Sequence, residues 1–145
     1  MLAALNTPGT TKIVAHKSRD HTEILFKYLK IPIKIKKTKK LSFIEIEGKN
    51  NIKSFNYNIS SDISSSAFFI VLTLLSKKSS LTVKNVNINP SRTGSINILN
   101  KMGAKIIFRN KRKYKGEKIA DIYVKSAKFL KAINSCLSAN LIKKN

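Results

Sequence analysis

Two stretches of this chain of 145 residues are similar enough to each other to fix much of its architecture. Residues 19–35 align without gaps on residues 92–108, at a shift of 73 positions. Five apolar positions of the first stretch fall on apolar positions of the second: Leu25 on Ile98, Phe26 on Leu99, Leu29 on Met102, Ile33 on Ile106 and Ile35 on Phe108. Self-similarity at one fixed spacing indicates that one structural unit occurs twice.

The first copy has the pattern of a βαββ unit. The short β-branched run 10–15 predicts a strand, and Ser18 is predicted to begin a helix that Pro32 ends. The first turn of this helix would contain two acids, which the helix dipole favours, Asp20 and Glu23. Its predicted buried face is made of Ile24, Leu25, Tyr28 and Leu29.

Two further strands complete this copy. Isoleucine alternates with lysine around Ile33 and Ile35, and apolar residues alternate with glutamate over residues 43–47. Both patterns predict half-buried strands, with Ile44 and Ile46 on the core face of the second. The basic run 36–40 between them is interpreted as a solvated hairpin turn.

The second copy predicts the same order of elements. Strands are expected over residues 81–88, 105–108 and 119–124, with a basic hairpin loop over residues 110–118. A helix between the first two strands would bury Ile96, Leu99 and Met102 and end at Gly103. Alternating aromatic and asparagine residues predict one more short strand, over residues 55–59.

A helix over residues 64–75 is expected to precede the second copy. It is apolar on every side from Ala67 to Leu75, and Ser60, Ser61 and Asp62 are candidate N-caps. A helix that is apolar all round has to be buried all round, so we expect a larger parent structure in which this helix is shared between units. The fold class is predicted as α+β, with repeated units.

The formal net charge of +22 favours a polyanionic partner at first sight. However, 25 of the 29 basic residues are lysine and only 4 are arginine. Lysine, isoleucine and asparagine, all with A/T-rich codons, make up 59 of the 145 residues, which indicates compositional drift of a genome. Specific readers of nucleic acid depend on arginine. A small basic βαββ module that binds nucleic acid through residues 36–40 and 109–118 remains the alternative.

Other functional classes find little support in the sequence. A single cysteine, Cys136, excludes an internal disulfide framework and a cysteine-rich zinc site. His16 and His21 are five positions apart and lack the spacing of a helical metal site. There is no secretory signal pattern, and the longest apolar stretch, 67–75, is far shorter than a membrane span. Phosphate-binding and dinucleotide-binding glycine motifs are absent from the sequence.

Two equivalent turns each carry an arginine between a strand and a helix. They are Ser18-Arg19 and Ser91-Arg92. A guanidinium and the N–H groups at a helix N-terminus can converge on one anion, so both turns are candidate phosphate sites. Arginine at such a position also commonly caps a helix or forms an ion pair, and this structural role is the alternative.

Several motifs in one order carry a family resemblance. They are LNTPGT at 5–10, SRDHTE at 18–23, SDISSSAFF at 61–69, NVNINPSRTG at 85–94 and KMGAKI at 101–106. In this order and spacing they resemble the 3-phosphoshikimate 1-carboxyvinyltransferase family, also called EPSP synthases, in the branch with arginine in an (S/T)-R-D-H-T-E motif. The resemblance extends over residues 2–131, almost the whole chain.

The resemblance implies a fold of six βαβαββ-type units in two lobes, with the substrates between the lobes. Residues 1–58 would end the first lobe and residues 59–145 would begin the second. The implied reaction transfers the enolpyruvyl group of phosphoenolpyruvate to the 5-hydroxyl of shikimate 3-phosphate, in chorismate and aromatic amino acid biosynthesis. The family implies no metal or organic cofactor, no specific nucleic acid, no membrane, a monomer and a cytoplasmic location.

The resemblance also assigns residues. Arg19 matches the arginine that contacts the 3-phosphate of shikimate 3-phosphate, and Ser18 is a weaker candidate beside it. Asp62, Ser64 and Ser65 match a motif where the lobes cross, although capping of helix 64–75 is the role that we expect for them. Arg92 is interpreted as structural.

The family pattern departs from this chain at both ends. A Ser-Ala-Gln substrate motif would precede Met1, and the catalytic acid and later cationic groups would follow residue 145. The chain therefore resembles a central fragment of about two of six units, expected to be inactive alone. An inert remnant is a further alternative.

Overall fold

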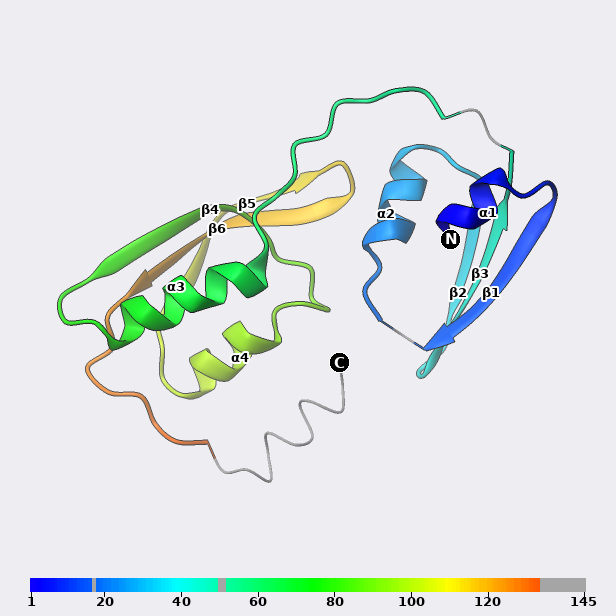
Figure 1. The fold of residues 1–145 in the computed structure, drawn as a ribbon. Helices are drawn as coiled ribbons and strands as arrows, with labels where there is room; N and C mark the ends of the chain where they lie inside the picture. Colours follow the sequence, from blue (N-terminus) through cyan, green and yellow to red (C-terminus); the bar gives the residue numbers. More distant parts are fainter. Residues whose placement is uncertain (17, 50–51, 134–145) are drawn as a thin grey trace. The chain divides into compact units, whose positions relative to one another are not determined.

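The computed structural model describes residues 1–16, 18–49 and 52–133. The chain divides into two compact units, unit 1 over Met1–Asn58 and unit 2 from Ile59 onward (Figure 1). Each unit contains a separate antiparallel three-stranded sheet with helices packed against it. This arrangement confirms the predicted α+β fold class.

Unit 1 has its last strand in the middle of the sheet. Its strand order is β1-β3-β2, and β3 pairs antiparallel with both neighbours. Ile44 of β3, for example, lies opposite Ile13 of β1 and Ile35 of β2. The elements are α1 (Leu2–Asn6), β1 (Thr10–His16), α2 (His21–Tyr28), β2 (Ile33–Lys37) and β3 (Leu41–Glu47).

The core of unit 1 lies between this sheet and its two helices (Figure 1). Ile44 and Ile46 of the central strand are 5% and 0% exposed, which confirms the core face predicted for this strand. Phe26 of α2 and Ala4 of α1 pack against them from the same side. The opposite face of the sheet carries Phe43 and is exposed.

Two details of α2 differ from the sequence prediction. The helix begins at His21 with Asp20 as N-cap, so Ser18 does not begin it. Its most buried apolar side chain is Phe26, at 2% exposure, whereas Tyr28 is 40% exposed. Apolar residues occur at five positions between 24 and 29, so periodicity alone does not fix the inward face. The face with the phenylalanine ring turns inward because that buries a large apolar surface while Tyr28 keeps its hydroxyl near water.

Unit 2 repeats the topology of unit 1. Its strand order is β4-β6-β5, again with the last strand in the centre and both pairings antiparallel. The two copies inferred from the sequence therefore fold as equivalent βαββ units, the second preceded by an additional helix. The elements are α3 (Ile63–Leu75), β4 (Ser80–Asn87), α4 (Gly94–Lys101), β5 (Ile106–Tyr114) and β6 (Glu117–Lys125).

The core of unit 2 joins one face of α3 to α4 and to the sheet. Ile63, Ile70 and Leu74 of α3 are at most 1% exposed, and Ile96 of α4 and Ile122 of β6 are fully buried. Leu99 belongs to the same cluster, and Met102 packs against it. These contacts confirm the face that helical spacing predicted for α4.

Two predictions in this half of the chain are wrong. Residues 55–59 form no strand and belong to neither of the two sheets described; the pairing nearest to them is an isolated bridge between Ser61 and Val86. The segment 110–118 is not a loop, because β5 continues to Tyr114 and β6 begins at Glu117. Polar residues along this hairpin satisfy their backbone groups by pairing across it, which their composition does not reveal.

Two irregularities in the sheet of unit 2 lie opposite the same part of β6. The register shifts between Val83 and Val86 in β4, and between Arg109 and Arg112 in β5. Asn85 and Asn110 lie in these segments with φ of 55° and 49°, a left-handed conformation that asparagine tolerates better than most residues. Asp121 of β6 accepts a hydrogen bond from the backbone N–H of Asn85 (2.8 Å) and from Nδ2 of Asn110 (2.7 Å). One carboxylate thus holds both irregular segments.

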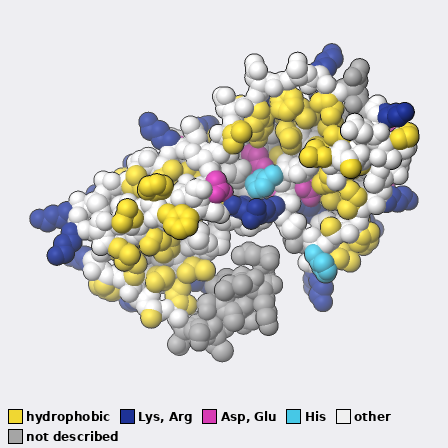
Figure 2. Space-filling model, in the orientation of Figure 1, with side chains coloured by type: hydrophobic (Ala, Val, Ile, Leu, Met, Phe, Trp, Pro, Cys, Tyr) yellow, Lys and Arg dark blue, Asp and Glu magenta, His cyan; other side chains and the backbone are white. Residues whose placement is uncertain are grey.

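The outward face of α3 is apolar and exposed. Phe68, Phe69, Leu72 and Leu75 are 80%, 61%, 63% and 70% exposed, and no residue of α3 is charged. Hydrophobic side chains gather on the side of unit 2 where α3 and α4 lie (Figure 2). Within the described residues, the helix is therefore buried on one face only, and not on all sides as its sequence predicts.

Substitution of Ile70 by alanine should strongly destabilise unit 2. Ile70 is fully buried, and removing such a side chain costs about 2–5 kcal/mol of the free energy of unfolding. Urea titration with amide hydrogen exchange of residues 119–124 measures this loss. Leu72→Ala, an exposed position of the same helix, is the matched control and should cost less than about 0.5 kcal/mol. Equal losses in the two variants would contradict the assigned core face.

Candidate functional site

Ser18 and Arg19 lie in the segment that connects β1 to α2. Both side chains are exposed, and Asp20 follows directly as the N-cap of the helix. Within the described part of the chain, neither residue has a hydrogen bond or an ion pair. The Arg19 guanidinium is therefore available to an anion, close in sequence to the N-terminal turn of α2.

The start of α2 is tied to the end of β2. The Asp20 carboxylate does not cap its own helix and instead accepts a hydrogen bond from Nζ of Lys37 at 3.0 Å. The helix itself begins with the backbone bond from Ile24 N–H to the Asp20 carbonyl. Lys37 belongs to the basic run 36–40, which the sequence predicts to be a solvated turn. In the structure Lys37 is the last residue of β2, and the sequence does not predict its contact with Asp20. In the sequence, one acid in one segment and a run of lysines in another do not specify which lysine forms the contact.

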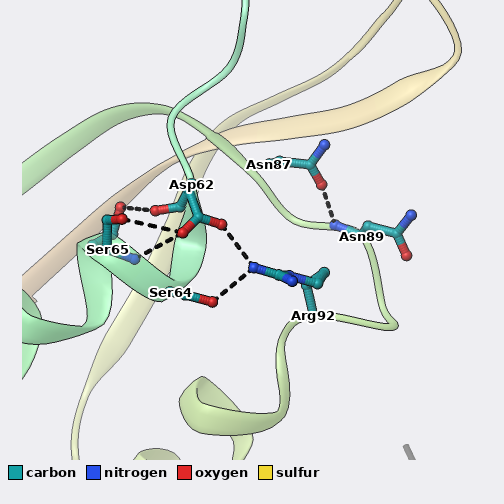
Figure 3. A network of polar contacts seen from close by, with 7 residues as sticks. Asp62, Ser64, Ser65, Asn87, Asn89 and Arg92 are labelled. Carbon is teal, nitrogen blue, oxygen red and sulfur yellow. Dashed lines mark hydrogen bonds and ion pairs between the residues drawn. The ribbon is translucent and has the colours of Figure 1, made fainter. Parts of the chain in front are cut away.

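The equivalent turn of unit 2 is organised differently. Arg92 donates from Nη2 to Oδ1 of Asp62 at 2.8 Å and to Oγ of Ser64 at 2.7 Å (Figure 3). The Arg92 side chain is only 13% exposed. Arg92 thus joins the turn before α4 to the first turn of α3, which confirms the structural role predicted for it.

Asp62 is the N-cap of α3. Its Oδ2 accepts hydrogen bonds from the backbone N–H of Ser65 at 3.0 Å and from the Ser65 hydroxyl at 3.2 Å (Figure 3). These bonds, first the one from the Ser65 backbone, and the nearby charge of Arg92 hold the pKa of Asp62 below its ordinary value of 3.8. The prediction that Asp62 caps this helix is therefore confirmed.

The turn that carries Arg92 is further fixed by Asn89. Oδ1 of the buried Asn89 side chain accepts hydrogen bonds from the backbone N–H of Ser91 at 3.0 Å and from its hydroxyl at 2.8 Å. The backbone N–H of Asn89 donates to Oδ1 of Asn87 at 2.9 Å (Figure 3). Asn89 and Arg92 thus both form their hydrogen bonds within unit 2. Of the two arginines, Arg92 is held by Asp62 and Ser64, whereas Arg19 in the turn of unit 1 is exposed and available to a ligand.

Comparison with known proteins decides the family. The sequence model of the family described as EPSP synthase (3-phosphoshikimate 1-carboxyvinyltransferase) matches residues 1–139. A protein of that name from Petrotoga mobilis is 40% identical over 129 residues, 88% of this chain and 29% of the relative. One from Thermodesulfovibrio yellowstonii is 41% identical over 136 residues, 92% of this chain and 31% of the relative.

The chain belongs to the EPSP synthase family.

A solved structure gives the same result for the fold. EPSP synthase from Acinetobacter baumannii superposes with a TM-score of 0.77 at 36% sequence identity, covering 92% of this chain and 30% of that protein. This chain therefore spans about a third of the length of the EPSP synthases that it matches.

Over residues 1–16, 18–49 and 52–133, no group of three or more His, Cys, Asp or Glu side chains could hold a metal ion. In the same ranges, no helix is long and apolar enough to cross a membrane. Cys136 lies outside the described residues.

Acidification should lower the stability of unit 2. Hydrogen bonds from Asn110 and then Asn85 lower the pKa of Asp121, and the pKa of Asp62 is lowered as well. Both groups have higher pKa values in the unfolded chain, so the unfolded chain takes up more protons as the pH falls toward and below 3.8. Their contribution is therefore present at neutral pH and is lost in acid.

Urea midpoints measured at pH 7 and about pH 3.5 test this dependence. We expect the difference between the two midpoints to shrink in Asp121→Asn, which removes the titrating group. Glu45→Gln, in the sheet of unit 1, is the control and should leave the midpoint of unit 2 unchanged. An undiminished difference in Asp121→Asn would contradict the assignment.

Proposed function

We propose that this chain is part of an enzyme that transfers the enolpyruvyl group of phosphoenolpyruvate to the 5-hydroxyl of shikimate 3-phosphate and releases phosphate. Within that enzyme, Arg19 contacts the 3-phosphate of shikimate 3-phosphate. The observation that supports this role is the contrast between the two arginine turns. Arg92 is held by Asp62 and Ser64, whereas Arg19 is exposed and has no partner in the described chain.

The chemistry of a phosphate monoester fits this position. A guanidinium offers parallel N–H donors to phosphate oxygens, and charge-assisted bonds of this kind are about twice as strong as neutral ones. The N–H groups of the first turn of α2 add a positive partial charge beside it. The Ser18 hydroxyl is the second, weaker candidate for a hydrogen bond to the same phosphate.

The proposed share of this chain in the reaction is binding rather than proton transfer. Addition of the 5-hydroxyl to phosphoenolpyruvate gives a tetrahedral intermediate, and elimination of phosphate completes the transfer. General acid and base groups have to move protons in both steps. The family resemblance assigns those groups to parts of the enzyme other than residues 1–145. Arg19 would neutralise and orient the phosphate of one substrate.

The two units are proposed to belong to different lobes. Residues 1–58 would end the first lobe and residues 59–145 would begin the second. We further propose a cytoplasmic monomer that uses no metal or organic cofactor. The match to relatives of this name over about 90% of the chain supports the family membership from which these proposals are taken.

The nucleic-acid alternative gains no support from the basic hairpin of β5 and β6. The Arg109 guanidinium stacks on the Tyr123 ring, with its carbon 4.0 Å from the ring centre. Arg112 donates to the side-chain oxygen of Asn85 and to the carbonyl of Asn110. Both arginines of this hairpin are exposed, but each already makes a contact inside unit 2.

The chain of 145 residues alone should show no turnover. A coupled assay of released phosphate, with both substrates present, measures this directly. Calorimetry with shikimate 3-phosphate should detect at most weak binding, with a dissociation constant on the order of millimolar, because one arginine of a multi-group site gives little affinity. Turnover above background, or micromolar binding that is lost in Arg19→Ala, would show that the chain contains a more complete site than we propose.

A chimera tests the proposed role of Arg19 in an active setting. The matched segment of the Petrotoga mobilis relative is replaced by the aligned segment of this chain, which is 88% of its length. We expect the chimera to retain turnover, and Arg19→Ala to raise its KM for shikimate 3-phosphate by about 10- to 100-fold, as expected for loss of a charged hydrogen bond.

Arg109→Ala in the same chimera is the matched control, since it removes an arginine outside the proposed site. A folded chimera without turnover would contradict the proposed function of this segment. An unchanged KM in Arg19→Ala would contradict the role of Arg19 alone.

A further inference from the structure

The contact between Lys37 and Asp20 joins a rigid strand to the segment that carries Arg19. Nζ of Lys37 and Oδ2 of Asp20 are 3.0 Å apart, and the two side chains are 36% and 28% exposed. The residues are seventeen positions apart, so the contact depends on the fold of unit 1 and not on local sequence. Partial burial shields such a pair from screening by salt better than a fully exposed pair.

The strand end that supplies Lys37 is well fixed. Lys37 is the last residue of β2 and lies opposite Ser42 of the central strand, and Ser42 is 5% exposed. The hairpin beyond it is closed by the bond from Thr38 N–H to the Leu41 carbonyl at 2.8 Å, and by Leu41 N–H to the Thr38 hydroxyl at 3.0 Å. The ammonium of Lys37 therefore projects from an anchored backbone.

The carboxylate of Asp20 is directed to this lysine although it occupies a position from which it could cap its own helix. An aspartate at an N-cap usually accepts a hydrogen bond from the first turn of its helix, and Asp20 does not. Arg19 precedes it by one residue, so the backbone that positions the Arg19 guanidinium is continuous with the backbone that the ion pair holds.

We infer that Lys37 is a positioning residue for Arg19: through Asp20 it fixes the Ser18–Arg19 turn in the geometry that receives the phosphate. This inference rests on the proposed function of Arg19. It adds a residue outside the SRDHTE motif to the site, drawn from the run 36–40 that composition alone assigns to solvent. Lys37 acts through Asp20 and does not itself contact the ligand.

The competing explanation is a direct attraction between the Lys37 charge and the phosphate. Substitutions of Lys37 and of Asp20 distinguish this attraction from positioning. Lys37→Ala removes a positive charge, whereas Asp20→Asn removes a negative one. Simple electrostatics therefore predicts opposite effects on affinity for an anion. Loss of positioning predicts weaker binding in both variants.

The experiment titrates the chain of 145 residues with shikimate 3-phosphate at millimolar concentrations and follows its amide NMR shifts. We expect the dissociation constant to rise by about two- to fivefold in both Lys37→Ala and Asp20→Asn, the range for one partly exposed ion pair. Lys37→Arg should restore the wild-type value, because arginine can pair with Asp20. Lys36→Ala, the neighbouring exposed lysine of β2, is the control and should change it less than twofold.

Amide hydrogen exchange of Ile24, whose N–H donates to the Asp20 carbonyl at 3.0 Å, gives a second readout that does not need bound ligand. Exchange should become several-fold faster in Lys37→Ala and Asp20→Asn, and should remain at the wild-type rate in Lys36→Ala and Lys37→Arg. Unchanged exchange in Lys37→Ala would overturn the inference, whatever the binding data show. Tighter binding in Asp20→Asn would overturn it in favour of direct attraction.

Arg19→Ala distinguishes this inference from the proposed function. If Arg19→Ala binds shikimate 3-phosphate as wild type does, the assigned role of Arg19 fails, and the positioning role of Lys37 fails with it. If Arg19→Ala loses binding while Lys37→Ala matches Lys36→Ala, the proposed function stands and the inference fails. In the double variant Arg19→Ala/Lys37→Ala, the second substitution should add no further loss, because Lys37 acts through Arg19.

Discussion

Each unit of this chain depends on pairing with the strand that comes last in its sequence. In unit 1, β1 and β2 do not pair with each other, and both form their ladders only with β3. In unit 2, β4 and β5 depend on β6 in the same way. The central strands also contribute fully buried residues to the two cores, Ile46 and Ile122. The arginine turns are positioned by this arrangement: the end of β1 is held at His16 opposite Leu41 of the central strand, and the turn with Arg19 follows.

The sequence predicts the fold wherever burial imposes a period. The alternation in β3, the spacing of Ile96 and Leu99 in α4 and the repeat itself all reflect a requirement to turn apolar side chains to one side. The prediction fails at residues 55–59, where an alternating pattern joins neither of the described sheets, and in the β5–β6 hairpin, where pairing holds a polar sequence in strand form. Strand pairing is a relation between distant segments, and the composition of one segment does not contain it.

The candidate site was predictable in part for the same reason. Arg19 and Arg92 occupy equivalent positions of the repeat, so the sequence treats them alike unless a family resemblance separates them. The structure separates them by their neighbours: Asp62 and Ser64 reach Arg92 from another helix, and Arg19 has no such partner in the described chain. In the two copies of the unit, equivalent arginines can therefore have different roles: Arg92 stabilises unit 2, and Arg19 is available to a ligand. The contact of Lys37 with Asp20 could not be predicted, because the two residues are seventeen positions apart and come together only in the folded unit.

The exposed apolar face of α3 affects how molecules of this chain associate with one another. Contact between two such faces would remove large apolar side chains from water, whereas the net charge of +22 makes two molecules repel each other. The range of that repulsion is set by dissolved ions, at about 10 Å in 0.1 M salt and about 3 Å in 1 M salt. The colloidal behaviour of the chain therefore depends on ionic strength: dilute buffer keeps molecules apart, and concentrated salt lets the uncharged helix faces approach.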